Sequence, residues 1–502
     1  MDTITDKQGG VCFRVDDNQP IQKWTAFAEV FNRHGFKFCA ALNYGRMAGN
    51  EEYIKLVKTL EAQGHEVMDH TPVHSVDKFP LPEGDDPDAW RARPGVDHVD
   101  EGRVYLTYEK VAPAGLAGGR GDISGKRMTS RTPGDLSETN RNRFTAVYLP
   151  DLDKVYMFEQ KGEGEDAFLE LRSFWNEDNV DLGERRDAVY YRLSKSDVDI
   201  TLEGRRRLTE ASLRLAEGLG LRRPVTWIQP GSGGCSDFHR EEVRACYGDL
   251  YGYVSAATYP NRALKCHNEY DPAGDKRFGM MWGDFNDEGK DLAWNQKRIA
   301  DGVARHFVLF GHSHFWERVM PDGWEGYLRR VDGLLSWCRE TGIPVRTQAE
   351  WSRILYDARQ DPGVNVFPGL DVDRDGDGIP DGYDISEARL DRGDGAPEGG
   401  GVALVVEKAG SVCRVARLGG LEKGVNAFTI WTRGRGEVAV TFTFSEVGKA
   451  EMLAFRDEGP AWTSHRGTVA VPHDVSLVDI SIDCAGPGGG GFKVSGMGLH
   501  QE

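Results

Sequence analysis

Short apolar stretches alternate with amphipathic helical stretches along the first 70 residues, and this alternation restricts the fold more than any other feature of the sequence. Val11–Val15, Phe36–Leu42 and His65–Met68 have the composition of buried strands. Between them, Ile21–His34 and Glu51–Gln63 carry apolar residues at helical spacing, and a glycine follows each helix. Strands that alternate with helices through short links predict a parallel sheet or barrel of the α/β class.

Carboxylate and imidazole side chains follow two of these strands. Asp16 and Asp17 end the first strand, and His70 and His74 come directly after the third. In parallel α/β folds the chemistry lies at the carboxyl ends of the strands. A helical turn after His70 would bring the two histidines, four residues apart, onto one face. Such a set predicts a site for a divalent metal, and the alternative is a pair of surface histidines near a loop.

These residues carry a family resemblance. The sequence resembles the polysaccharide deacetylase family, whose NodB-homology domain (carbohydrate esterase 4-like) has an Asp-Asp motif after its first strand. The second motif of that family is His-(Ser/Thr)-x-x-His, here His70-Thr71-Pro72-Val73-His74 after the strand that contains Gly64-His65-Glu66. The first motif departs from the family pattern, because it reads Arg14-Val15-Asp16-Asp17-Asn18 where the family usually has Thr-Phe-Asp-Asp-Gly.

The resemblance implies a fold and a site. It implies a distorted (β/α) barrel over residues 1–357, with an insertion at 75–200. It also implies that Asp16 is the general base and that Asp17, His70 and His74 hold a divalent transition metal, zinc being the first choice.

Later strand ends supply the remaining candidates. The predicted strand His306–Phe310 leads to Gly311-His312-Ser313-His314, and the resemblance makes His312 the general acid. The family's third motif contains an arginine where this chain has Gln229. Residues two apart in a strand share a face, so we expect Arg14 beside Asp16 as the replacement for the missing arginine. The alternative is that Arg14 is a solvent-facing strand residue. The candidate substrate-binding residues are Arg14, Gln229, Trp282, Asp284 and His314.

The insertion at 75–200 does not follow the α/β alternation. It contains the strand-like pieces Arg103–Val111, Thr145–Leu149 and Lys154–Glu159. We interpret it as a segment over the barrel mouth that shapes substrate choice. An independent small β-domain is the alternative.

Residues 358–400 are rich in Asp, Gly and Pro and are interpreted as a linker that contains a calcium loop. The spacing of its acids resembles the calcium loops of thrombospondin type 3 repeats and dockerins, with a glycine at loop position 6. The predicted calcium ligands are Asp373, Asp375, Asp377, Asp381 and Asp384. A merely acidic linker is the alternative.

The C-terminal residues 401–502 contain seven strand-like segments separated by glycine-rich turns, which predicts an all-β sandwich. It resembles the accessory sandwiches of carbohydrate-active enzymes. The two interpretations left open are a carbohydrate-binding domain and a structural cap.

The net charge of −18 argues against nucleic acid or an anionic membrane as the main partner. The eight cysteines contain no CxxC pair and do not indicate a disulfide framework. No apolar run reaches the length of a membrane span, and the first ten residues lack the apolar region of a signal peptide. For an enzyme acting on a polysaccharide we nevertheless expect a secreted, periplasmic or cell-surface location.

The sequence therefore predicts a metal-dependent hydrolase that removes acyl groups, such as acetyl, from a carbohydrate. One alternative is a calcineurin-like metallophosphoesterase. Its metal ligands would be Asp237, His239, Asp284, Asp287, His312 and His314. A second alternative is a non-catalytic glycan-binding protein on a deacetylase-like scaffold.

Overall fold

The structure is a computed structural model of the whole chain. It describes residues 9–70, 93–109, 118–132, 144–193, 212–226, 279–284, 290–357 and 364–501, with short gaps inside these ranges at 48, 101–102, 153, 163–165, 172–180, 317–319, 321, 422, 445–448, 473–475 and 486–490. The chain divides into two compact units. One comprises Met1–Val15, Gln22–Cys39 and Tyr259–Glu502, and the other comprises Asp16–Ile21 and Ala40–Thr258. Among the described helices, none combines the length and the apolar character needed to cross a membrane.

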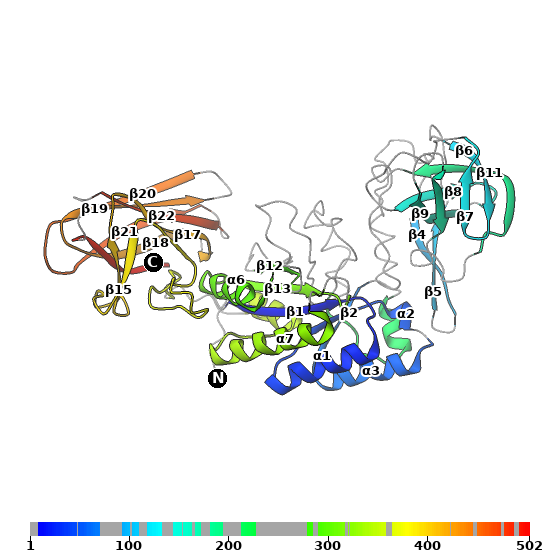
Figure 1. Cartoon of the computed structure of the whole chain (residues 1–502), viewed down its shortest axis with the longest axis horizontal. Helices are drawn as coiled ribbons and strands as arrows, with labels where there is room; N and C mark the ends of the chain where they lie inside the picture. Colours follow the sequence, from blue (N-terminus) through cyan, green and yellow to red (C-terminus); the bar gives the residue numbers. More distant parts are fainter. Residues whose placement is uncertain are drawn as a thin grey trace. The chain divides into compact units, whose positions relative to one another are not determined.

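The α/β part contains five strands in one sheet, in the order β12-β13-β1-β2-β3. β1 pairs with β13, and β13 with β12, in parallel (Figure 1). The N-terminal elements are β1 (Gly10–Asp16), α1 (Ile21–His34), β2 (Cys39–Leu42), α2 (Tyr44–Met47), α3 (Glu51–Ala62) and β3 (Glu66–Asp69). The later elements are β12 (Gly279–Asp284), α6 (Leu292–Ala304), β13 (Val308–Ser313), α7 (Gly323–Glu340) and α8 (Gln348–Asp357).

This sheet has the predicted α/β character. Closure into a (β/α) barrel is not seen within the described residues, and residues 227–278, where further strands were expected, lie outside them.

Strand β1 is at the centre of this sheet because its residues are buried on both faces. Its first residue must be a glycine. A Cβ on Gly10 would lie 2.2 Å from a ring carbon of Trp351 and 2.7 Å from the carbonyl oxygen of Pro344. The Trp351 indole nitrogen in turn donates a hydrogen bond of 3.0 Å to the carbonyl of Val11. The close packing of α8 on β1 therefore explains the absence of a side chain at position 10.

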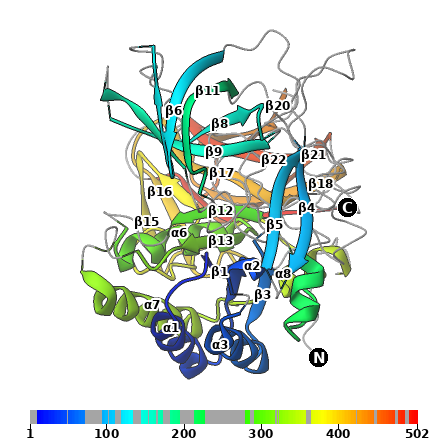
Figure 2. The ribbon, with the colours of Figure 1, turned by 90° about the vertical axis from the view of Figure 1, so that its right-hand side faces the viewer.

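Helices α1 and α7 lie side by side along β1 and β13 (Figure 2). The apolar face of α1 buries Trp24, Phe27 and Phe31, as its helical spacing predicts. The Phe27 ring stacks on Tyr327 of α7 with centroids 6.0 Å apart. At the end of α1, the His34 Nε2 lies 2.7 Å from a carboxylate oxygen of Asp332 on α7. Aromatic packing and this polar contact together fix the two helices.

The segment expected as an insertion contains a closed six-stranded β-barrel in the order β10-β7-β6-β11-β8-β9 (Figure 1). The strands are β6 (Gly118–Ser124), β7 (Arg127–Ser130), β8 (Phe144–Leu149), β9 (Lys154–Lys161), β10 (Phe168–Leu171) and β11 (Glu184–Leu193). A separate hairpin precedes it, β4 (Arg93–Asp100) with β5 (Arg103–Glu109). The barrel has its own hydrophobic core, which includes Val147, Phe158 and Leu169. These features are those of a small β-domain with its own core, the alternative interpretation of this segment.

The C-terminal part consists of two five-stranded antiparallel sheets, β14-β17-β22-β19-β20 and β15-β16-β23-β18-β21. Both sheets contribute to one core, for example Val440 and Ile480 from the first and Phe428 and Leu499 from the second, which is the layering of a β-sandwich. The strands are β14 (Tyr383–Ile385), β15 (Ala388–Arg392), β16 (Val402–Val406), β17 (Gly410–Leu421), β18 (Gly424–Arg433), β19 (Gly436–Phe444), β20 (Lys449–Asp457), β21 (Thr463–Val471), β22 (Ser476–Ala485) and β23 (Lys493–Gln501).

Two of these strands come from the stretch expected to be a linker. β14 and β15 lie at 383–392 and pair with β17 and β16. The hydroxyl of the buried Tyr383 donates a hydrogen bond of 2.6 Å to the carbonyl of Pro368. The stretch is predicted to be a linker because its composition is rich in Asp, Gly and Pro, and only a few of its residues are apolar and enter the sandwich core.

Candidate metal centre

The Asp16-Asp17 pair stands where β1 ends, and the backbone changes direction between the two residues. Asp16 is buried and is the last residue of the strand. Asp17 has a φ of +71°, in the left-handed region. This conformation costs a non-glycine residue roughly 1–2 kcal/mol, so the surrounding contacts must hold it. In a continued strand, the two carboxylates would point to opposite faces of the sheet. Because the backbone turns here, they do not follow that alternation.

The carboxyl group of Asp17 lies in a poorly solvated position, with 15% of the side chain exposed. Burial, followed by the adjacent charge of Asp16, raises the pKa of Asp17 from 3.8 to about 7, although the nearby Arg46 acts in the opposite direction. One of these two neighbouring carboxylates is therefore unfavourable to ionise. A cation bound between them would stabilise the charged forms of both, so the pair is a favourable place for a cation.

His70 follows β3 and brings its imidazole to this carboxylate. Its side chain is 2% exposed, and its Nε2 lies 3.7 Å from Oδ1 of Asp17. Two ligands of a tetrahedral zinc ion are separated by about 3.4 Å, given metal–ligand bonds of about 2.1 Å. A small adjustment would therefore let both atoms bind one ion. Asp17 and His70 fit a divalent metal in donor type and in separation, and they are the two predicted ligands that the structure describes.

Backbone and amide contacts hold the loops that carry these ligands. The Asn18 side chain and the Asn43 backbone exchange two hydrogen bonds, one of 2.9 Å from the Asn43 amide to Asn18 Oδ1 and one of 3.3 Å from Asn18 Nδ2 to the Asn43 carbonyl. Asn43 Nδ2 donates to the carbonyl of His70 at 2.5 Å. The Gln19 side chain donates to the carbonyl of Asp16 at 2.7 Å. The sequence offered no signal for the part that Asn43 plays, because these contacts join residues far apart in the chain.

The neighbouring strands place three candidate positions in one row. Arg14 of β1 pairs in register with His312 of β13, which in turn pairs with Asp284 of β12. The Arg14 side chain is buried. The side chains of His312, Asp284 and Trp282 lie outside the described residues, so their roles stay predictions. His314 continues beyond β13, and its ring stacks on Trp316 with centroids 4.1 Å apart.

Other predicted positions fall outside the described residues altogether. These are His74 and Gln229 of the deacetylase interpretation and Asp237, His239 and Asp287 of the phosphoesterase interpretation.

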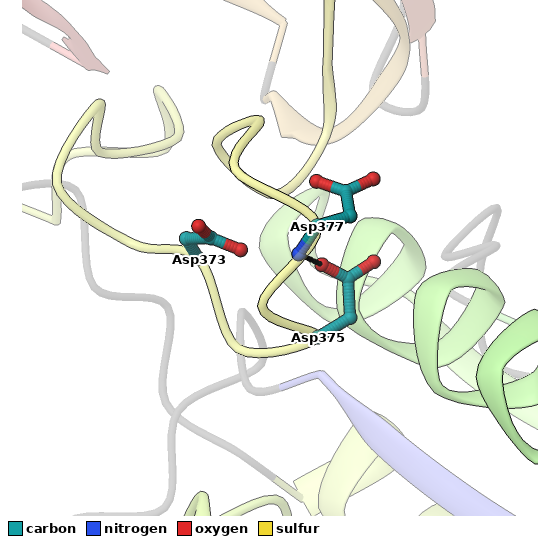
Figure 3. Close-up of side chains that lie close together, drawn as sticks. All are labelled: Asp373, Asp375 and Asp377. Atoms are coloured by element: carbon teal, nitrogen blue, oxygen red, sulfur yellow. Dashed lines mark hydrogen bonds between the residues drawn. The ribbon is translucent and has the colours of Figure 1, made fainter.

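A second acidic cluster lies in the predicted calcium loop. Carboxylate oxygens of Asp373, Asp375 and Asp377 lie within 4.8 Å of one another (Figure 3). Oxygen ligands on one calcium ion lie at most about 5 Å apart, because each Ca–O distance is about 2.4 Å. The turn depends on Gly378, at loop position 6, whose φ is +87°. These three carboxylates therefore have the composition and spacing of calcium ligands.

The other two predicted calcium ligands are not part of this cluster. Asp381 is buried and accepts hydrogen bonds from the Arg374 amide at 3.0 Å and from its guanidinium at 2.7 Å. Asp384 is an exposed residue of strand β14. The cluster instead contacts a cation that the sequence did not reveal, since Lys297 Nζ on α6 lies 2.7 Å from Asp377 and 3.9 Å from Asp375.

No protein-family model and no curated protein matches the sequence. Among solved structures, the chain is similar to a peptidoglycan N-acetylglucosamine deacetylase in complex with a hydroxamate-type benzamide, at 10% identity and a TM-score of 0.30, over 69% of this chain and 89% of that chain. It is also similar to the Xyl-CE4 domain of a multidomain xylanase from the hindgut metagenome of Trinervitermes trinervoides, at 7% identity and a TM-score of 0.29, over 68% and 89%.

A further match covers a smaller share of the chain. It is a CBM61 protein in complex with β-1,4-galactotriose, at 16% identity and a TM-score of 0.20, over 24% of this chain and 88% of that chain. Likenesses at this level carry no conclusion about activity, which we derive from the residues themselves.

Proposed function

We propose that this protein is a metal-dependent hydrolase that removes acyl groups from a carbohydrate. The observation that carries the proposal is the 3.7 Å approach of His70 Nε2 to Asp17 Oδ1 directly after the buried Asp16. The carbohydrate part rests on the resemblance of the Asp-Asp and His-Thr-x-x-His motifs to those of polysaccharide deacetylases. A substrate of this kind is in keeping with a secreted, periplasmic or cell-surface location.

Each residue has a separate part in the proposed reaction. Asp17, His70 and His74 would hold the metal, with zinc the first choice for this donor set. When bound, the metal would lower the pKa of a water and polarise the acyl carbonyl. Asp16 would accept the proton of the attacking water, and His312 would protonate the leaving amine or alkoxide.

The proposal is tested by measuring zinc content together with acetyl release from N-acetylated and O-acetylated oligosaccharides. A phosphate ester such as p-nitrophenyl phosphate serves as the probe for the phosphoesterase alternative. Zinc at one ion per chain with acetyl release supports the proposal. Phosphate release without acetyl release would overturn it.

We also propose that the sandwich binds glycan, on the strength of a cluster at one end of it. The partly exposed Arg433 lies over the Trp462 ring, 5.0 Å from its centroid, and is ion-paired to Asp394. Trp431, two residues before Arg433 on β18, donates from its indole nitrogen to Glu398 at 3.3 Å. Partly exposed indole rings beside charged hydrogen-bonding groups suit the alternating apolar faces and hydroxyls of a sugar. Trp462→Ala should weaken retardation of the full-length protein in gels that contain polysaccharide, and unchanged retardation would contradict this.

A further inference from the structure

Residues 42 and 43, at the exit of β2, contact both loops that carry the proposed metal ligands. On one side, Asn18 pairs with the Asn43 backbone through the bonds of 2.9 and 3.3 Å described above. On the other side, the His70 amide donates to the Leu42 carbonyl at 3.1 Å, and its carbonyl accepts from Asn43 Nδ2 at 2.5 Å. Hydrogen bonds therefore fix both the backbone amide and the backbone carbonyl of His70.

The contacts of Asn18 act on the residue immediately before it. Asp17 has the left-handed φ of +71°, a conformation that contacts of the residues on both sides help to hold. Gln19 fixes the preceding side through the Asp16 carbonyl at 2.7 Å, and its own carbonyl accepts from the Tyr53 hydroxyl at 3.0 Å. Asn18 fixes the following side by pairing with Asn43 in both directions. A glycine at position 18, usual in the family that the sequence resembles, has no side chain with which to do this.

We infer that Asn18 and Asn43 form a positioning clamp that sets the separation of the Asp17 carboxylate and the His70 imidazole, and so sets the affinity for the metal. The inference rests on the proposed function, because it needs these two residues to be ligands. Both asparagines act through the backbone of the ligand loops, so they are positioning residues and not ligands themselves. Groups that orient metal ligands typically change metal affinity about 10- to 100-fold when they are removed.

The test is a titration of the full-length protein with zinc alone against a competing chelator. Asn18→Gly and Asn43→Ala should each weaken zinc binding about 10- to 100-fold. The double variant should lose less than the product of the two single losses, because the substitutions remove a shared contact. Asn43 is completely buried, so its variant is the one at risk of misfolding. Asn18 is partly exposed and supplies the milder variant.

Asn50→Ala is the matched control. Asn50 is the N-cap of α3, and its side chain accepts from the Tyr53 amide at 3.0 Å. Its removal should lower the melting temperature and leave zinc affinity within about twofold of the wild type, because an N-cap contributes to helix stability. If Asn18 had only a structural role, Asn18→Gly would likewise lower the melting temperature and leave the zinc affinity nearly unchanged.

The outcomes separate the inference from the proposed function. If the wild type binds zinc, His70→Ala loses it and Asn18→Gly binds it as tightly as the wild type, the clamp is wrong and the metal site stands. If the wild type binds no zinc, both are overturned. Weaker binding in Asn18→Gly, with an unchanged circular dichroism spectrum and an unaffected Asn50→Ala, supports the clamp.

Discussion

At the scale of single residues, the two adjacent aspartates have different environments, and we propose that they therefore have different roles. Asp16 ends a buried strand, whereas Asp17 turns into the left-handed region and approaches His70. Neighbouring acids in different surroundings are a common way to divide the work of proton transfer and of binding. This division can be tested by changing each residue on its own.

Asp16→Asn should keep the metal and slow turnover strongly. Asparagine is nearly isosteric with aspartate but cannot accept the proton of the attacking water, so we expect the rate to fall by about 10²–10⁴-fold. Zinc content by atomic absorption and initial rates of acetyl release check this. Loss of zinc from Asp16→Asn would instead make Asp16 a ligand.

The pH dependence of the metal-free protein reports on Asp17. Its folded pKa of about 7 lies above its usual value of 3.8, so the folded state binds the proton more tightly than the unfolded state does. This stabilisation is fully present below pH 3.8 and is lost as the pH rises through about 7. Asp17→Asn should therefore stabilise the metal-free protein at pH 8, by at most about 4 kcal/mol, and have little effect at pH 4.

Urea unfolding at the two pH values measures this difference. In the wild type, zinc competes with the same proton, so zinc affinity should fall as the pH is lowered below about 7. Zinc affinity that does not vary with pH would contradict the assignment of Asp17 as a ligand.

At the scale of elements, the predicted calcium loop contacts helices on one side and the sandwich on the other. Lys297 of α6 contacts Asp377, and the Trp337 indole of α7 donates to the Arg374 carbonyl at 2.9 Å. On the sandwich side, Arg392 of β15 lies 3.3 Å from Asp373. Removal of calcium from such a junction should loosen the stretch between these elements and leave the α/β sheet intact.

The variant Lys297→Gln distinguishes between two interpretations, a calcium-binding loop and an acidic cluster that is neutralised by the lysine. The ammonium group occupies the neighbourhood of the carboxylates, so its loss should raise calcium affinity several-fold and destabilise the calcium-free form, because like charges then face each other. Isothermal titration with calcium and limited proteolysis at 364–400, with and without chelator, measure both effects. If titration of the wild type with calcium gives no heat of binding, and calcium does not change its proteolysis, the cluster is not a calcium site.

At the scale of the whole molecule, the two enzymatic interpretations place the metal on different residues. In the deacetylase interpretation, replacing His70 and His74 together by alanine should remove the metal and abolish acetyl release, while His312→Ala keeps the metal and slows the reaction about 10²–10⁴-fold. In the phosphoesterase interpretation, the variant lacking both His70 and His74 should keep its metal, and His312→Ala should bind the metal more weakly. Metal content of the two variants decides, and metal retained in the former but lost from the latter would overturn the deacetylase assignment.

The residues near the chain's start show what the sequence by itself determined. α1 occupies Ile21–His34 as predicted, because the apolar spacing of a helix is a property of adjacent turns. The meeting of Asp17 with His70 followed from the rule that the strands of an α/β sheet end at a common edge. These features depend on local periodicity and on the order of elements, and both can be read along the chain.

Only the tertiary structure decided the contacts that hold the candidate sites in place. The left-handed turn at Asp17, the pairing of Asn18 with Asn43 and the approach of Lys297 to Asp377 join segments whose separation in sequence carries no pattern. The same holds for the closed β-barrel of 118–193 and for the entry of β14 and β15 into the sandwich. Strand partners and side-chain clamps are chosen by non-local packing and hydrogen bonding, which periodicity in one segment does not encode.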